Sequence, residues 1–344
     1  MQIINKGRSC FFRELFLSLH MTYRSNLLRQ INYINILRGI VFLALIVFIG
    51  SCRNHEDQAF RIGRLSDRKA SGKRPYQYLI ENRNQTKMTV RDQKFNLDNR
   101  STLSLLMEPM EDSGSSKWIK MTYKRITVHL EGKDGEQKDY ASDQSDTTEA
   151  INQVLSAIAG TSLLILVDSS GNVANEKGSE DVVQRVMAKL SFLSTDELKK
   201  VKQQLSQLIG MTFLKDNFSM GFKLLPDSIV KVGQSWKRNE VTSQQLPVNL
   251  TSEFKIDDAY DSICVIKSKG EITNNNQTIN YMGYDVGSDL EGGQNGSFTI
   301  NWRTGILQEG TTDAKIAGNL VIQGIAVPLD VRYTRSIKLE KFNQ

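Results

Sequence analysis

The residues with the clearest chemical potential form the sequence Ile49-Gly50-Ser51-Cys52. A cysteine thiol can carry a diacylglycerol as a thioether, and small residues just before it fit the narrow subsites of a signal peptidase. Residues 39–50 (GIVFLALIVFIG) are apolar or glycine and follow the cationic Arg38. These twelve residues are too few for a membrane-spanning helix, which needs roughly 20, but they suit the apolar region of a secretory signal peptide. The pattern predicts cleavage before Cys52 and acylation of its thiol.

This order of residues resembles the bacterial lipobox, with Ile49 at a position where leucine is commoner. We therefore expect residues 1–51 to be a lipoprotein signal peptide, in which Ile49, Gly50 and Ser51 are recognised by the peptidase. Cys52 becomes the acylated N-terminus, and acyl chains at about 0.8 kcal/mol per buried CH₂ give a durable membrane anchor. The alternative is an uncleaved membrane anchor beside a coincidental cysteine. The long stretch before the apolar run leaves two start positions open, Met1 and Met21.

Most of the net positive charge lies in this leader. The whole sequence has 44 basic and 38 acidic residues, a net charge of +6. Residues 1–51 hold six of the basic residues and one of the acidic residues, so the remainder has a net charge of only +1. A nucleic-acid partner is therefore disfavoured, because proteins that bind nucleic acids need surplus positive charge on their folded part.

The rest of the sequence lacks the signatures of catalytic and metal sites. The two histidines after the leader, His55 and His129, do not have the spacing of metal ligands, and no CxxC occurs. The nearest approach to a GxSxG nucleophile elbow, residues 233–237 (GQSWK), fails at its last position. We therefore expect a non-enzymatic protein with no metal or cofactor; a hydrolase is the remote alternative, because distant carboxylates can meet in space. Cys264, within an apolar run, is expected to be a buried, inert thiol.

The elements of the N-terminal half begin after a polar segment. Residues 52–74 are mostly polar and charged, which predicts a flexible tether between membrane and folded domain. Residues 76–81 and 101–107 alternate in polarity and predict strands. Residues 117–131 are apolar on one face before Lys124 and on the other face after it. Such a switch occurs at a β-bulge or where one strand passes between two packed layers.

Helices are expected in the middle of the chain and strands toward its C-terminus. Three segments with one apolar face, residues 151–158, 182–190 and 198–208, predict amphipathic helices. The predicted strands are residues 163–168, 250–256, 262–267, 271–282, 297–303 and 328–340. The last of them alternates most regularly, with apolar residues at Leu329, Val331, Tyr333, Ile337 and Leu339. Such alternation is typical of an antiparallel sheet with one buried face.

Together these elements predict an α+β, mainly β fold. Long antiparallel strands would form one or two curved sheets, resembling a half-barrel, packed on a few amphipathic helices. We expect residues 75–225 to form a β-rich unit with three helices and residues 226–344 to form an antiparallel β unit. The two units either form separate domains or share one sheet.

Four segments carry a family resemblance: residues 120–126 (KMTYKRI), residues 163–173 with Asp168 and Gly171, residues 225–227 (LPD) and residues 230–236 (VKVGQSW). Together they resemble an uncharacterised family of Bacteroidetes lipoproteins with a domain of unknown function. The resemblance covers residues 75–340. It implies an envelope location and a β fold, and it supplies no catalytic residues.

Three tripeptides, which begin at Asp146, Asp227 and Asp261, have Ser or Thr second and an aliphatic residue or Thr third. They are similar to the sequon of Bacteroidetes O-glycosylation and make Thr147, Ser228 and Ser262 candidate modification sites. The alternative is chance, because so short a pattern recurs easily.

Two non-enzymatic functions follow. The first is binding of a lipid or another hydrophobic ligand between sheet and helices. Seven aromatic residues would then line a cavity or else form ordinary core: Tyr76, Tyr78, Trp118, Tyr123, Trp236, Phe298 and Trp302. The second is a structural or accessory role in an envelope protein complex, which predicts an exposed apolar patch. Both place the protein in the bacterial envelope, anchored to the outer membrane through acylated Cys52, on its periplasmic or its surface side.

Overall fold

The computed structural model describes most of the chain from residue 75 onward. The described ranges are residues 75–90, 93–113, 116–132, 135–144, 149–168, 173–190, 231–241, 248–274, 278–281, 284–322 and 324–340, with single positions at 194, 198, 202, 205, 209 and 224. The predicted signal peptide and tether lie outside the described residues.

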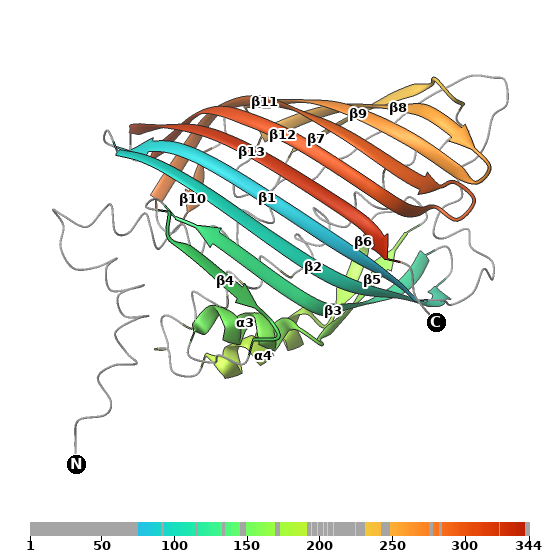
Figure 1. The fold of residues 1–344 in the computed structure, drawn as a ribbon, viewed down its shortest axis with the longest axis horizontal. Coiled ribbons are helices and arrows are strands. Elements are labelled where there is room, and N and C mark those ends of the chain that lie inside the picture. Colours follow the sequence, from blue (N-terminus) through green and yellow to red (C-terminus); the bar gives the residue numbers. More distant parts are fainter. Residues whose placement is uncertain are drawn as a thin grey trace, which may run out of the picture.

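Thirteen strands in the described ranges form one antiparallel sheet (Figure 1). They are β1 (Tyr76–Val90), β2 (Gln93–Ser113), β3 (Ser116–Glu131), β4 (Gln137–Ala141), β5 (Ser162–Val167), β6 (Val173–Lys177), β7 (Ser235–Val241), β8 (Val248–Tyr260), β9 (Ile263–Asn274), β10 (Ile279–Tyr281), β11 (Tyr284–Asn301), β12 (Ile306–Ile322) and β13 (Ile325–Glu340). The expectation of a mainly β fold with long antiparallel strands is confirmed.

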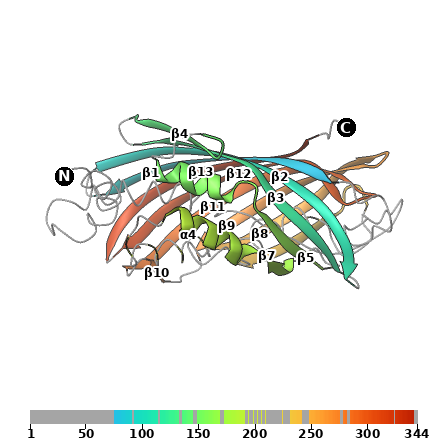
Figure 2. The same ribbon diagram turned by 90° about the horizontal axis from the view of Figure 1, so that it is seen from below.

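The strand order brings the two ends of the described chain together. It is β6-β5-β3-β2-β1-β13-β12-β11-β9-β8-β7, with β4 beside β3 and β10 beside β11. The first strand, β1, pairs along its length with the last strand, β13, so that Gln77 lies opposite Glu340. Strands from both sides of residue 225 therefore belong to the same sheet, and Figure 2 shows that this sheet is curved.

One face of the sheet, which we call the interior face, carries the buried side chains. On β1 the even-numbered residues face it: Ile80 and Thr86 are buried, whereas Glu81 and Lys87 are exposed. On β13 every second residue from Val327 to Ile337 is buried. The predicted alternation in residues 328–340 is confirmed.

Several strands are longer than the sequence predicts. The strand expected at residues 76–81 extends to Val90, and the one expected at 101–107 begins at Gln93. Residues 284–296, which contain four glycines and were not expected to be extended, belong to β11. In each case the missed part carries polar residues or glycines on its interior side, which is a loop signal in the sequence alone.

A β-bulge explains the polarity switch in β3. Tyr123 pairs with Leu105 and Arg125 pairs with Ser104, which leaves Lys124 without an opposite residue. One extra residue shifts the alternation by one position, so the apolar residues on both sides of Lys124 face the interior. These residues are Ile119, Met121 and Tyr123 before the bulge and Ile126, Val128 and Leu130 after it. Of the two explanations that the sequence left open, the bulge is the one that the strand register shows.

Deletion of Lys124 should destabilise the protein strongly. Without the extra residue, the strand beyond it would turn over and move Val128 and Leu130 from the interior to the outer face. Full burial of one such side chain is worth about 1.5–3 kcal/mol, so we expect the free energy of unfolding to fall by about 3 kcal/mol or more in urea titrations. Lys124→Ala keeps the bulge at an exposed position and should stay within about 0.5 kcal/mol of wild type. Wild-type stability of the deletion variant would contradict this role.

Two of the three expected helices are present among the described residues. Helix α3 (Ala150–Ile158) packs Leu155 with Val128, Leu130 and Tyr140 of β3 and β4. Helix α4 (Ser179–Lys189) buries Val182, Val183 and Val186. Most of the third expected helix, residues 198–208, lies outside the described residues.

Two large apolar clusters form on the interior face. The helix-side cluster joins strand residues such as Met121, Phe298 and Ile337 with residues of α3 and α4. All described members of the second cluster, the strand-only cluster, come from strands. They include Phe95, Leu250, Leu290, Leu329 and Val331. On β13 the two clusters lie at opposite ends, with Ile337 in the first and Val331 in the second. A segment of the interior face therefore lies between the two clusters.

Candidate ligand-binding face

Buried polar side chains separate the two apolar clusters, and we call this set the polar belt. Strand pairing aligns its members in two neighbouring rows that run across the sheet. One row contains Ser101, Asn82, Arg335, Thr312 and Ser268, and the next contains Asn99, Asn84, Tyr333, Gln294 and Ser252. All of these except the half-buried Asn82 are buried. The interior face is thus apolar, then polar, then apolar along the strands.

Hydrogen bonds within the belt satisfy only part of its polar groups. Tyr333 Oη donates to Asn82 Oδ1 at 2.8 Å, and Asn82 Nδ2 donates to Ser101 Oγ at 3.4 Å. Four buried atoms of the belt make no hydrogen bond to the protein: Ser268 Oγ, Gln294 Oε1, Arg335 Nε and Arg335 Nη1. Buried polar atoms nearly always have partners, so a group of exceptions at one place calls for a physical explanation.

Two glycines leave space for the belt side chains. A Cβ atom on Gly296 would lie 2.5 Å from Ser268 Oγ, and one on Gly270 would lie 2.7 Å from Gln294 Cγ. Both distances are too short for ordinary contact, so these strand positions need glycine for the neighbouring polar side chains to occupy the interior.

Burial raises the pKa of two ionisable groups on this face, Tyr333 and Cys264. Burial raises the pKa of Tyr333, and the charge and hydrogen bonding of Arg335 oppose that rise. Burial, with a smaller contribution from Asp258, raises the pKa of Cys264 to about 12. The Cys264 side chain is fully buried in the helix-side cluster, so its thiolate is scarce at neutral pH. The expectation that Cys264 is buried is confirmed.

The aromatic residues singled out in the sequence gather mostly in the helix-side cluster. Tyr76, Tyr123, Trp236 and Phe298 are buried members of it, and Tyr78 and Trp302 pack against it. Trp118 stands apart: it lies on the opposite face, where the Lys177 ammonium is 4.8 Å from its ring centroid. Ordinary core packing therefore accounts for most of these aromatic side chains.

Of the predicted modification sites, only Ser262 is described. It lies in the turn between β8 and β9, half-buried, and its carbonyl accepts a hydrogen bond from the Trp302 backbone N–H at 2.9 Å. Cys52, the residues Ile49, Gly50 and Ser51 before it, Thr147 and Ser228 lie outside the described residues.

Within the described ranges, no three His, Cys, Asp or Glu side chains are grouped so that they could hold a metal ion. No helix in the described part of the chain is long and apolar enough to cross a membrane.

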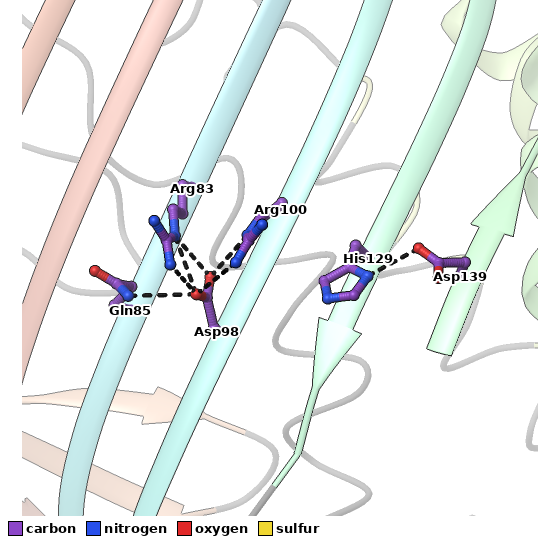
Figure 3. Close-up of polar contacts among 6 residues, drawn as sticks. All are labelled: Arg83, Gln85, Asp98, Arg100, His129 and Asp139. Carbon is purple, nitrogen blue, oxygen red and sulfur yellow. Dashed lines mark hydrogen bonds and ion pairs between the residues drawn. The ribbon is translucent and has the colours of Figure 1, made fainter. Parts of the chain in front are cut away.

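The outer face of the sheet, opposite the belt, carries paired charges (Figure 3). Asp98 accepts hydrogen bonds from Arg83 Nε at 3.0 Å and from Arg100 Nη2 at 3.2 Å. On the next strands, His129 Nδ1 lies 2.8 Å from Asp139 Oδ1. Arg332 on β13 similarly pairs with Asp313 at 2.6 Å. Each of these outer-face arginines thus has a carboxylate partner.

Protonation of Asp98 should weaken the protein at acidic pH. Burial raises the pKa of Asp98, but hydrogen bonds and charges from Arg83 and Arg100 outweigh burial and hold the pKa below its ordinary value. A carboxyl whose pKa is lower in the folded state stabilises that state above its unfolded pKa of about 3.9, and this contribution is lost as the pH falls through the folded pKa. Asp98→Asn should therefore lower stability by about 1 kcal/mol at pH 7, and the difference should be smaller at pH 3 than at pH 7.

Urea unfolding at both pH values measures this effect. Asp330→Asn, at an exposed position of β13, is the control for loss of an outer-face carboxylate. A difference between wild type and Asp98→Asn that is the same at both pH values would contradict the assignment.

The sequence analysis missed the polar belt, although one signal of it is present. In residues 328–340, every second residue is apolar except at Arg335, which occupies a position where the alternation calls for a buried apolar side chain. A charged residue at an interior position is a signal of function or of a buried ion pair. Its neighbours in the belt come from strands distant in sequence and follow only from the register.

Similarity between the chain and solved structures is weak. Lipovitellin, in a structure titled for its lipid–protein interactions, is 9% identical, with a TM-score of 0.44, over 78% of this chain and 25% of that chain. DynF from the dynemicin biosynthesis pathway of Micromonospora chersina is 6% identical, with a TM-score of 0.18, over 80% and 82%. An outer membrane channel from Pseudomonas putida F1 is 8% identical, with a TM-score of 0.21, over 77% and 95%. The chain thus spans about a quarter of the length of lipovitellin.

Comparison of sequences, unlike comparison of structures, identifies the family of the chain. No curated protein matches the chain. The sequence model of a family of unknown function, DUF6263, matches residues 114–307, which is more than half of the 344 residues. The predicted resemblance to a family with a domain of unknown function is confirmed to that extent. The chain belongs to the DUF6263 family of unknown function.

Proposed function

We propose that this protein is a lipid-anchored lipoprotein of the bacterial outer membrane, of Bacteroidetes type, that binds a lipid or another hydrophobic ligand without catalysing a reaction. The anchor is acylated Cys52, and residues 53–74 tether the folded part to it. The lipobox-like sequence at residues 49–52 and the short apolar run before it support this location.

The arrangement of side chains on the interior face is the main support for the binding role. Two apolar clusters lie on one face of a single large sheet, and a belt of buried polar groups with unpaired atoms lies between them. Sites for small hydrophobic molecules are mostly apolar and contain a few convergent polar groups that fix orientation. The outer face instead carries charged residues paired with one another, which suits contact with water.

Mass spectrometry of lipids extracted from purified residues 53–344 tests the binding role. This chain lacks Cys52, so any lipid recovered is held non-covalently and not as an acyl anchor. We expect one class of lipid at a constant ratio to protein close to one. A folded, monomeric protein that yields no lipid above the level of a co-purified control protein would contradict the proposal and would favour the accessory role, which cross-linking to envelope proteins then tests.

A further inference from the structure

We propose that Arg335 binds the anionic head of the ligand, so that the ligand is an amphiphile with one oxyanion group, a carboxylate or phosphate, and an apolar chain. This assignment rests on the proposed binding function and specifies its ligand class. The carrying observation is a buried guanidinium at the centre of the interior face whose Nε and Nη1 atoms make no hydrogen bond to the protein.

The burial and surroundings of Arg335 set it apart from other arginines of the sheet. Arg335 is only 7% exposed. On β13 and on its two neighbours, β1 and β12, none of the described interior-facing residues is Asp or Glu. The outer-face arginines Arg83, Arg100 and Arg332 have side chains that are 43–51% exposed, and each lies beside a carboxylate. Arg335 is thus the most buried cation of these strands, and their described interior-facing residues offer it no carboxylate.

An arginine in this position cannot relieve the cost of burial by losing its proton. A buried lysine can become neutral, but the guanidinium stays charged at all physiological pH values. Burial of a charge is costly unless an opposite charge and hydrogen bonds compensate. An oxyanion supplies the opposite charge, and its oxygens can accept charge-assisted hydrogen bonds from the unpaired N–H groups.

The residues around Arg335 suit an oxyanion head. Asn82 and Thr312 lie directly opposite Arg335 on the two adjacent strands, and Tyr333 lies on the same face two residues away. Asn82 and Thr312 each have side-chain groups that can donate a hydrogen bond. Apolar surface begins on both sides of this group, at Ile337 toward the helix-side cluster and at Val331 toward the strand-only cluster. A head at Arg335 would therefore place an attached acyl chain along one of the two clusters.

The test compares an anionic and a neutral ligand of the same chain length. The full chain, purified in a non-ionic detergent and washed free of co-purified lipid, is titrated with palmitate, with hexadecanol and with inorganic phosphate, and occupancy is measured by native mass spectrometry. We expect palmitate to bind at least tenfold more tightly than hexadecanol, as a charge-assisted contact requires. Arg335→Met should remove that preference. Arg332→Met, which removes a cation from the other face of the same strand, should retain it.

The outcomes separate this inference from the proposed function. If palmitate and hexadecanol bind equally to wild type, or if Arg335→Met keeps the preference, Arg335 does not bind the head, although the binding function stands. If neither ligand binds, the proposed function itself fails. If inorganic phosphate binds as tightly as palmitate and Arg335→Met abolishes both, Arg335 recognises a free anion and the amphiphile assignment is overturned. A circular dichroism spectrum of Arg335→Met like that of wild type shows that loss of binding is not loss of folding.

Discussion

Arg335→Met should make the ligand-free protein more stable than wild type, by about 1–4 kcal/mol. Replacement of buried ionic groups by apolar residues of similar volume is often neutral or stabilising by this amount. Methionine retains the unbranched stem of arginine and can pack against Ile337 and Tyr333, its neighbours on the same face of the strand. Two nitrogens of the guanidinium have no hydrogen-bond partner. Its removal therefore abolishes the cost of burying a charge and loses few hydrogen bonds.

Urea unfolding of lipid-free protein measures this difference. Arg332→Met is the matched control, since Arg332 lies on the same strand, is exposed and pairs with Asp313 at 2.6 Å. Loss of that surface pair should cost between about 0 and 1 kcal/mol. The two substitutions are thus expected to have opposite signs. A loss of about 3–5 kcal/mol in Arg335→Met, the effect of breaking a buried ion pair, would show that the guanidinium has a compensating partner within the chain.

Addition of an anionic amphiphile should reduce the stability difference between Arg335→Met and wild type, and reverse it once the ligand contribution exceeds that difference. A ligand that binds only the folded state stabilises it by RT ln(1 + [L]/Kd), which is about 2.7 kcal/mol at one hundred times Kd. Wild type should gain this contribution from palmitate, and Arg335→Met should gain much less. The stability that Arg335 costs in the ligand-free protein would then be recovered on binding, which is a common arrangement at functional sites.

The fold could be predicted wherever the alternation of buried and exposed side chains continued without interruption along a strand. In residues 328–340 the alternation locates the buried face of β13, and the change of phase at Lys124 locates a bulge, because each added residue moves every later side chain to the other face. Both features depend on neighbours in the sequence and on a single buried face. They therefore need no knowledge of which strands pair.

Three strand predictions stopped at or beside the polar belt. The strand expected at residues 76–81 ended just before Asn82, and the one expected at 101–107 began at Ser101, itself a member of the belt. Gln294 lies within a stretch of β11 that was not expected to be extended. The strands expected at residues 250–256 and 328–340 did cross the belt, at Ser252 and Arg335. Polar residues at interior positions remove the alternation on which strand prediction depends. On β1, β2 and β11 the missed part of the strand and the candidate site therefore have the same physical cause.

The site itself could not be assembled from the sequence. Arg335 meets Asn82 only because β1 and β13, the first and last described strands, pair in one particular register. A shift of one residue would turn Asn82 to the outer face. That register is fixed by many pairings along both strands, which no local pattern encodes.

Cys52→Ser should abolish lipidation and with it the durable attachment of the mature chain to the membrane. The sequence offers one thiol directly after an apolar run and two small residues, and the serine hydroxyl cannot form the thioether. Each acyl chain lost removes about 0.8 kcal/mol of membrane affinity per buried CH₂. In cells fed an alkyne-tagged fatty acid, we expect the tag on wild type and none on Cys52→Ser.

Two further measurements decide between a lipobox and a coincidental cysteine. Cys264→Ser is the matched control: Cys264 is buried in the helix-side cluster, so its loss should leave the fatty-acid tag in place. The intact mass of wild type should correspond to a chain that begins at acylated Cys52, because residues 1–51 are expected to be removed. A wild-type chain that retains residues 1–51 and carries no tag would identify an uncleaved anchor. The interior face would then still be available for ligand, because Arg335 and the two clusters lie in the folded part, far along the chain from the leader.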